Sequence, residues 1–366
     1  DRHGHDSSML GHIKRIAQLR APKAQIDAYG AKHPFSGFVR IEWADGAALR
    51  VEFVVALDHE LNEDVLRTFE SSIETSIRSQ WPYAPVTLVH AHGATPEDLA
   101  RVAARRNVFL KSFSAYQGLL DFTDYLAKET KKLEEDPVYP PWLYVDQRAR
   151  WSLAGSRDES RTDHLLDTLW NDLDVPDKPR FVVVLGEFGV GKTFLLHELA
   201  RRMVTKKHTL VPVLVQLSKL EKASSIKQLL AQHFAAADFG QYHYDGFRYL
   251  LEQGRIALLF DGFDELALRL PYDRVMAHFR TVTEAAQGLA KVVVTSRRQH
   301  FLTDHEIKRE LLVEAERVAG SRFYLVEKFD KPQIRRFLVN LLKNEGEADT
   351  RYRQLDKVKD LLGLSE

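Results

Sequence analysis

Eight consecutive residues in the second half of the chain have the types and spacing needed to hold the phosphates of a nucleotide. The segment Gly186-Glu-Phe-Gly-Val-Gly-Lys-Thr193 follows an apolar run and precedes a helical pattern. Its glycines let successive backbone N–H groups turn toward phosphate oxygens, and the N-terminus of the next helix adds a favourable dipole. We expect Lys192 to reach the β- and γ-phosphates and the Thr193 hydroxyl to bind Mg²⁺. We call residues 186–193 the P-loop.

Three acidic residues, Asp261, Asp264 and Glu265, follow the apolar run Ile256–Phe260. An aspartate at the tip of a strand beside the P-loop supplies the oxygen ligands that Mg²⁺ prefers, and a further carboxylate can orient or activate an attacking water. The alternative is an acidic surface loop after a core strand, which the presence of the P-loop disfavours.

A third group of polar residues, Ser296, Arg297 and Arg298, follows the run Val292–Thr295. An arginine at a strand tip beside the P-loop can sense the γ-phosphate through a charge-assisted contact. The alternative, a surface arginine on a loop, is stronger for Arg298 than for Arg297.

Continuous apolar runs surround these motifs and predict the strands that position them. The runs are Phe181–Leu185, Val211–Leu217, Ile256–Phe260, Val292–Thr295 and Phe323–Val326. Runs of this kind, separated by helical patterns, are typical of a parallel sheet that helices cover on both faces. We therefore expect an α/β NTPase domain over residues 161–326.

Residues 1–127 show another alternation of strand and helix patterns, which predicts a small α/β domain. The expected helices cover residues 8–29, 62–79 and 117–131, and one more starts at Thr95-Pro96. The expected strands cover residues 37–43, 48–55, 86–90 and 107–112, with an Asp45-Gly46 hairpin turn between the first two. A charge run and a proline-rich stretch predict a linker over residues 128–160.

The three motifs together resemble those of the NACHT NTPases, which belong to the STAND class of ASCE P-loop NTPases. The resemblance covers about residues 140–366 and includes Leu258–Glu265, Val293–Arg297 and Leu325–Phe329. It implies a switch that holds ADP when closed, exchanges it for ATP, oligomerises and hydrolyses ATP slowly. It also implies that residues 327–366 begin a helical domain, whose continuation and winged helix would complete the nucleotide site in the family.

The resemblance further implies roles for single residues. Lys192 would grip phosphate, Thr193 and Asp261 would hold Mg²⁺, and Arg297 would be the γ-phosphate sensor. Asp264 or Glu265 would handle the attacking water. The residues expected to contact ATP or ADP are Gly186, Glu187, Phe188, Gly189, Val190, Gly191, Lys192, Thr193, Phe194 and Tyr144.

The first domain resembles another family. Residues Val86–Leu110 are similar to the last strand–helix–strand of Mrr-type restriction endonuclease folds. Those enzymes need an acidic residue and a Glu-x-Lys tripeptide on adjacent strands to hold Mg²⁺ and activate water. Glu52 is present, but Val54 stands at the lysine position, and Asp45 fits the hairpin turn as well as a metal site. We expect an inactive nuclease-like fold that docks an effector or adaptor protein.

Composition excludes several functions. The 366 residues include no cysteine, which excludes disulfides, thiolate catalysis and cysteine zinc sites. The 52 Lys and Arg balance the 52 Asp and Glu, so a protein built mainly to coat nucleic acid or membrane is not favoured. No apolar run approaches the ~18–20 residues of a membrane span, and we expect a cytoplasmic protein. The chain starts at Asp1 and stops within a helical pattern, so we expect a piece of a longer protein.

For two further groups of residues we prefer a structural role to a functional one. His3, His5, His90 and His92 could chelate a metal, but no third ligand is evident. The stripe of Arg101, Arg105 and Arg106 could touch phosphate, but a solvated helix face is the better interpretation.

The sequence as a whole predicts a NACHT-type signalling ATPase that couples nucleotide exchange to oligomerisation and effector output, with bacterial antiphage or stress sensing as the expected context. One alternative is an active Mg²⁺-dependent nuclease with a regulatory NTPase module, in which Lys32 or Arg50 replaces the missing lysine. A second is a P-loop kinase or other metabolic NTPase, which the Thr295–Arg297 sensor argues against.

Overall fold

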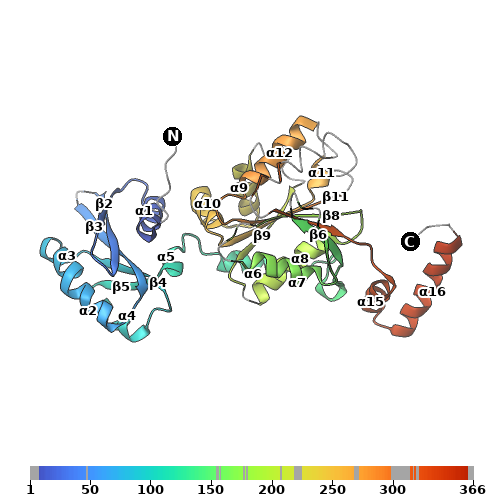
Figure 1. Cartoon of the computed structure of the whole chain (residues 1–366), viewed down its shortest axis with the longest axis horizontal. Helices are drawn as coiled ribbons and strands as arrows, with labels where there is room; N and C mark the ends of the chain where they lie inside the picture. Colours follow the sequence, from blue (N-terminus) through green and yellow to red (C-terminus); the bar gives the residue numbers. More distant parts are fainter. Residues whose placement is uncertain are drawn as a thin grey trace. The chain divides into compact units, whose positions relative to one another are not determined.

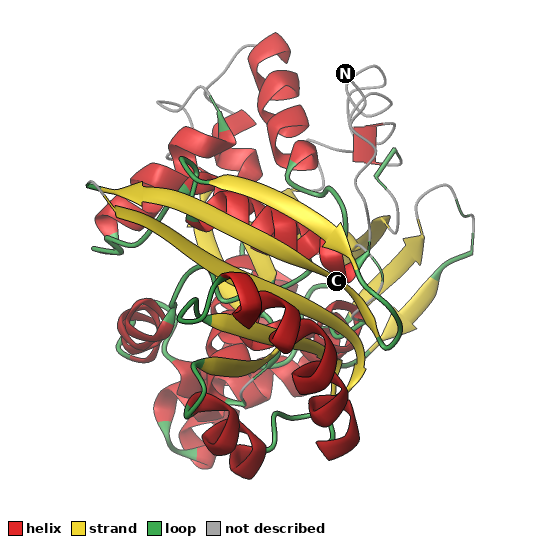
Figure 2. Ribbon diagram, turned by 90° about the vertical axis from the view of Figure 1, so that its left-hand side faces the viewer, coloured by secondary structure: helices red, strands yellow, loops and turns green. Residues whose placement is uncertain are grey.

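The chain folds into two compact units, Asp1–Leu120 and Asp121–Glu366, which are described here one at a time (Figure 1). The computed structural model describes residues 8–46, 48–153, 156, 158–175, 178, 180–206, 208–217, 225–267, 272–297, 314–315, 317–318 and 321–361. Strands of both units are twisted and lie between helices (Figure 2).

The first unit contains one five-stranded sheet. Its strands are, in spatial order, β1 (Gln25–Gly30), β2 (Phe35–Asp45), β3 (Ala48–Glu60), β4 (Val86–His92) and β5 (Val108–Ser112). The first three strands are antiparallel, whereas β3, β4 and β5 are parallel. Side chains of β3 alternate between the two faces of the sheet, so Phe53 and Val55 join one core while Glu52 and Val54 face the other side.

Helices flank this sheet. They are α1 (Met9–Arg20), α2 (Glu63–Phe69), the π-helical turn η1 (Glu70–Glu74), α3 (Thr75–Gln80), α4 (Glu97–Ala104) and α5 (Phe113–Tyr116). The helix expected over 8–29 is wrong beyond Arg20, because Pro22 excludes helical backbone at Ala21 and residues 25–30 form β1 instead. Thr95 does not cap α4, since its hydroxyl bonds His90 Nε2 at 2.8 Å.

The second unit contains the predicted parallel sheet. The five expected strands are β8 (Arg180–Gly186), β9 (Val211–Gln216), β10 (Ile256–Asp261), β11 (Lys291–Arg297) and β12 (Ser321–Val326). They are parallel and lie in the order β12-β8-β11-β10-β9. Their carboxyl ends therefore meet at one edge, where the P-loop and the acidic and arginine motifs come together.

Helices cover both faces of this second sheet, with α7 and α8 on one side and α10 to α12 on the other (Figure 1). The helices of this unit are α6 (Thr123–Glu134), the 3₁₀ turn η2 (Pro141–Leu143), α7 (Leu165–Leu173), α8 (Lys192–Thr205), α9 (Ile226–Ala236), α10 (Tyr244–Glu252), α11 (Phe263–Ala267), α12 (Tyr272–Glu284), α15 (Lys331–Leu342) and α16 (Glu345–Leu361). The last two pack on each other after β12, where the start of a helical domain was expected.

Residues 128–160 differ from the expected linker, because most of this segment belongs to the second unit. It includes the end of α6 and all of β6 (Ala149–Leu153), which pairs antiparallel with β12. Strand β7 (Ser160–Thr162) pairs with β6 and extends the sheet to seven strands. Helix α6 starts at Thr123 rather than Gln117 and packs on α8, so the proline-rich stretch is held between two folded elements.

Candidate nucleotide-binding site

The P-loop connects β8 directly to α8. Gly189 and Gly191 have φ of +81° and +87°, in the left-handed region that favours glycine. A Cβ on Gly191 would lie 2.7 Å from the side-chain nitrogen of Gln147, so the loop also needs glycine there for space. Gly191 is the N-cap of α8 and has no side-chain cap, which leaves the first N–H groups of the helix available to an anion.

Lys192 spans the P-loop from the start of α8. Its Nζ donates hydrogen bonds to the carbonyl oxygens of Gly186 at 3.0 Å and of Glu187 at 2.9 Å. Burial lowers the pKa of Lys192, against the carboxylate of Asp264, which acts to raise it. The ammonium group is thus held inside the loop, rather than solvated, and keeps the backbone curved around the position that phosphates would take.

Asp261 is the strand-end carboxylate expected to serve a metal ion, and it is 9% exposed. Its Oδ1 accepts a hydrogen bond of 2.6 Å from the hydroxyl of Thr295, which in turn accepts one from the Gly262 N–H at 3.0 Å. The Thr295 contact fixes the carboxylate by one oxygen. A fixed carboxylate and the Thr193 hydroxyl are hard oxygen donors of the kind that fits Mg²⁺.

Tyr139 lies beside the Thr193 side chain. Burial raises the pKa of Tyr139, the charges of Asp261 and Glu265 raise it further, and a hydrogen bond with the Thr193 side chain acts to lower it. Thr193 follows β8 at the end of the P-loop, whereas Asp261 and Glu265 lie at and just after the end of β10 in the same parallel sheet. The structure therefore brings the expected metal ligands and one candidate for water activation to the same edge of the sheet.

The two candidate water-activating acids differ in their surroundings. Asp264 is 6% exposed and forms an ion pair with Arg297, whose Nε lies 2.7 Å from Asp264 Oδ2. Glu265 is exposed. Arg297 also lies 5.0 Å from the centre of the Phe188 ring in a cation–π contact. Arg298 lies outside the described residues.

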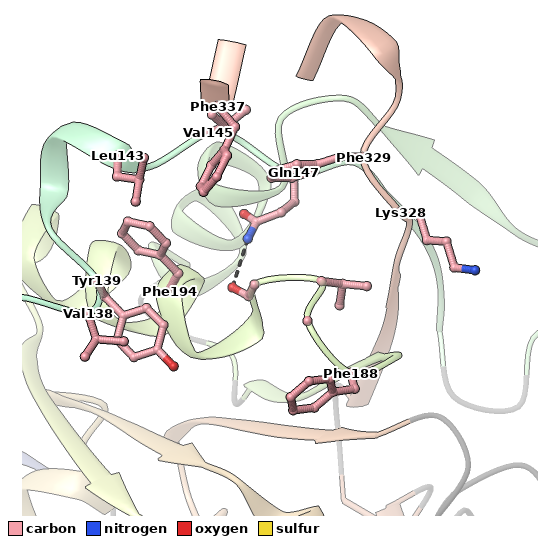
Figure 3. A pocket seen from close by; sticks show the side chains of 13 residues that line it. Val138, Tyr139, Leu143, Val145, Gln147, Phe188, Phe194, Lys328, Phe329 and Phe337 are labelled. Carbon is pink, nitrogen blue, oxygen red and sulfur yellow. Dashed lines mark hydrogen bonds between the residues drawn. The ribbon is translucent and has the colours of Figure 1, made fainter. Parts of the chain in front are cut away.

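A cavity of about 420 Å³ opens beside the P-loop (Figure 3). Phe194 and Tyr139 lie on one side of it, Lys328 lies on the other, and Gly189 to Gly191 form part of its wall. The remaining lining is apolar apart from Gln147, and consists of Val138, Leu143, Val145, Phe188, Phe329 and Phe337. An apolar cavity with aromatic walls next to a phosphate loop has room for a planar base.

Tyr144, expected to contact the nucleotide, is not among the residues that line this cavity. Its ring packs edge-on against Phe194 with centroids 5.3 Å apart, and its hydroxyl donates to Gln147 Oε1 at 2.7 Å. Sequence reasoning missed Gln147, Tyr139, Phe329 and Phe337. For Tyr139, the flanking prolines were a usable signal, because they argue against helix and for an extended segment along the surface.

The nuclease-like residues of the first unit are held in internal contacts. Burial raises the pKa of Glu52, while the charges of Arg20 and Lys111 act to lower it. Val54 is 2% exposed and packed in the sheet face that α1 covers. Asp45 forms an exposed ion pair with Arg50 at 2.5 Å.

The described members of the histidine and arginine groups make contacts within the first unit. His90 is fully buried and both ring nitrogens have partners, the His92 carbonyl at 2.9 Å and Thr95 Oγ1 at 2.8 Å. Arg106 pairs with Glu70 at 2.5 Å. Within the described residues, the set of three or more side chains close enough to share a metal ion is Asp146, His164 and Asp167, and neither His90 nor His92 belongs to it. His3 and His5 lie outside the described residues.

Comparison with family models identifies both units. Residues 180–345 match the model of the NACHT domain, and residues 6–122 match that of the NACHT-associated inactive Restriction Endonuclease 2. The second unit carries a NACHT domain. The NACHT domain is a P-loop NTPase domain, and the first unit is restriction-endonuclease-like, so the expected fold class and both resemblances are confirmed.

Similar proteins resemble this chain over limited lengths. An uncharacterized WD repeat-containing protein of Nostoc sp. is 28% identical over 244 residues, which are 60% of this chain and 16% of that protein. The AMPPCP-bound DnaA of Aquifex aeolicus is 16% identical, with a TM-score of 0.33 over 55% of this chain and 59% of that one. Domain III of the Thermotoga maritima replication initiation protein DnaA is 14% identical, with a TM-score of 0.33 over 55% of this chain and 85% of that one. Among the described residues, no helix is both long and apolar enough to cross a membrane.

Proposed function

We propose that the NACHT domain binds ATP and ADP with Mg²⁺ and works as a slow, nucleotide-driven signalling switch. The observation that carries this proposal is the position of the P-loop, which forms one wall of an apolar cavity of about 420 Å³ while its lysine faces the acidic strand ends. A nucleotide needs this combination, a phosphate cradle next to a pocket for its base.

The base would enter the cavity between the aromatic side chains. Phe194 follows the P-loop on α8, and its ring contacts both Tyr139 and Tyr144, with centroids 5.5 and 5.3 Å away. This contact holds Phe194 in one position against which a base can pack. Adenine rather than guanine follows from the family resemblance.

Metal binding would use Thr193 and Asp261. Bound Mg²⁺ would neutralise charge on the β- and γ-phosphate oxygens. The contribution of the chain is to present the Thr193 hydroxyl at the start of α8 and to hold the Asp261 carboxylate by its bond to Thr295.

Hydrolysis would depend on Glu265 more than on Asp264. Asp264 is buried and its Oδ2 is occupied by Arg297 at 2.7 Å, so this carboxylate has less access to a water than Glu265 has. Glu265 is exposed and its charge acts on Tyr139 beside Thr193, so it can reach a water in front of the phosphates. Arg297 would keep its Nε contact with Asp264 and offer its remaining N–H groups to the γ-phosphate when ATP is bound.

The whole protein would use this switch to control assembly. We propose that ATP binding favours oligomers and that the restriction-endonuclease-like unit then works by contact with an effector or a neighbouring copy, in bacterial antiphage or stress sensing. Its support is the inactive-nuclease family match and the burial of Val54 where a lysine would be needed. Light scattering after gel filtration with ADP and with ATP tests it, and an identical mass in both would contradict it.

Calorimetric titration of the chain with ADP and ATP, with Mg²⁺ and with EDTA, tests nucleotide binding. Lys192→Ala should remove most affinity, because the phosphates lose a cation and the loop loses the bonds to Gly186 and Glu187. Lys206→Ala, at an exposed lysine after the same helix, is the matched control and should bind as the parent does. Equal affinity in folded Lys192→Ala would contradict the assignment.

A further inference from the structure

Gln147 is a buried amide that connects the segment before β6 to the P-loop. Its side chain is 1% exposed, and its Nε2 donates a hydrogen bond of 2.9 Å to the carbonyl oxygen of Gly191 (Figure 3). That carbonyl also accepts the first helical bond of α8, from the Leu195 N–H at 2.9 Å. Gln147 therefore adds a second donor at the residue where the P-loop becomes a helix.

The Gly191 carbonyl sets the direction of this amide, and Tyr144 meets its other end. A carbonyl oxygen can only accept, so the amide must turn its NH₂ group toward Gly191 and its Oε1 toward Tyr144. The Tyr144 hydroxyl then donates to Oε1 at 2.7 Å. Asp146 Oδ1, at 3.4 Å, is a second and more distant acceptor for this hydroxyl, so the shorter bonds run from Tyr144 to Gln147 to Gly191.

The peptide group between Gly191 and Lys192 carries the consequence to the phosphate site. A trans peptide is planar, with its C=O and N–H pointing in opposite directions. Because Gln147 holds the Gly191 C=O on one side, the Lys192 N–H is held on the other, away from Gln147. A carbonyl that accepts two hydrogen bonds also polarises its peptide and makes the N–H a better donor.

The Gln147 amide lies so close to the P-loop backbone that residue 191 must be glycine. Gly191 has a φ of +87°, and any Cβ there would meet the Gln147 nitrogen at 2.7 Å. The approach of the amide and the left-handed backbone at Gly191 are thus parts of one arrangement.

We propose that Gln147 and Tyr144 are positioning residues for phosphate binding, which aim the Lys192 N–H at the nucleotide without contacting its phosphates. This role rests on the proposed nucleotide binding. It differs from the expectation that Tyr144 touches the nucleotide, because Tyr144 acts here through Gln147.

Binding of ADP, pyrophosphate and adenosine to the chain separates this role from a general loosening of the segment. Gln147→Ala should lower the affinity for ADP and for pyrophosphate about five- to tenfold, because one hydrogen bond is lost and the Lys192 N–H is no longer held in position. Adenosine should bind within about twofold of the parent, because it does not use the phosphate cradle. A variant that had only loosened the cavity wall would lose adenosine affinity as well, and this result would overturn the proposal.

Tyr144→Phe is a milder second variant that keeps the test decisive if Gln147→Ala does not fold. It should weaken pyrophosphate about two- to fivefold, and the double variant should be no weaker than Gln147→Ala, since both act through one chain of bonds. Gln232→Ala, at an exposed glutamine on α9, is the matched control and should leave all three affinities unchanged. If the parent protein binds ADP but Tyr144→Phe binds pyrophosphate as tightly as the parent does, the positioning role alone is overturned. Parent protein that binds neither ADP nor pyrophosphate would overturn the proposed function together with it.

Discussion

The guanidinium of Arg297 lies 2.7 Å from the carboxylate of Asp264, an acid that is only 6% exposed. The two residues come from different strand ends, Asp264 from the helix after β10 and Arg297 from the tip of β11. The ion pair holds the two side chains against each other at the edge of the sheet where the P-loop lies. Glu265, the neighbouring acid, is exposed, and we expect its carboxylate to face a water.

Glu265→Gln should slow hydrolysis strongly while ATP still binds. An amide keeps the size of the side chain but cannot accept a proton, and loss of a general base costs roughly 100-fold or more. Asp264→Asn is the matched comparison and should slow hydrolysis by less than about tenfold, because the carboxylate is already engaged by Arg297. Single-turnover release of phosphate from ATP measures both rates. If the two amide variants and the parent react at the same rate, neither acid takes part in hydrolysis.

Arg297 should distinguish ATP from ADP. Arg297→Ala alone would leave the buried Asp264 carboxylate without its cation, which is destabilising for reasons unrelated to nucleotide. The double variant Arg297→Ala/Asp264→Ala removes both charges, and we expect it to bind ATP about tenfold more weakly, since a charge-assisted bond to the γ-phosphate is lost. ADP affinity should stay within about twofold of the parent. Competition titrations with the two nucleotides measure the ratio, and an unchanged ratio would show that Arg297 does not sense the γ-phosphate.

Sequence patterns were sufficient for the parts of the fold that depend on local chemistry. Each apolar run of the second unit became a parallel strand, and the P-loop glycines adopt the backbone that their pattern requires. The end of α1 was predicted wrongly, although Pro22 marks it by disfavouring helical backbone at Ala21. What could not be read was pairing between distant segments. Nothing in the residues around Ala149 shows that they pair with β12, and nothing in Gln147 shows that its amide meets Gly191.

Glu52 should make the first unit less stable at neutral pH than a neutral side chain would. Its pKa is raised in the folded protein, chiefly by burial, so the folded state binds more protons than the unfolded state between pH 4.5 and that raised value. The contribution of Glu52 to stability therefore falls as the pH rises through this window. Glu52→Gln should unfold at a higher temperature than the parent at pH 7, and the difference should disappear below pH 4.5. Thermal unfolding of both proteins across this range measures it, and a less stable Glu52→Gln at pH 7 would mean that Arg20 and Lys111 outweigh burial.

The restriction-endonuclease-like unit should not cut DNA. Cleavage needs a cation near the metal-bound water to lower its pKa and to stabilise the developing charge. Val54 occupies the usual position of that cation and is packed under α1, while Arg50, one alternative, pairs with Asp45 and has a guanidinium that cannot act as a base. Restoring the lysine should not restore activity either, because Val54→Lys would bury a charge in the core and destabilise the unit. Supercoiled plasmid incubated with the chain and Mg²⁺ or Mn²⁺, with and without ATP, should remain intact. Nicking that is lost in Glu52→Ala would show that the unit is an active nuclease.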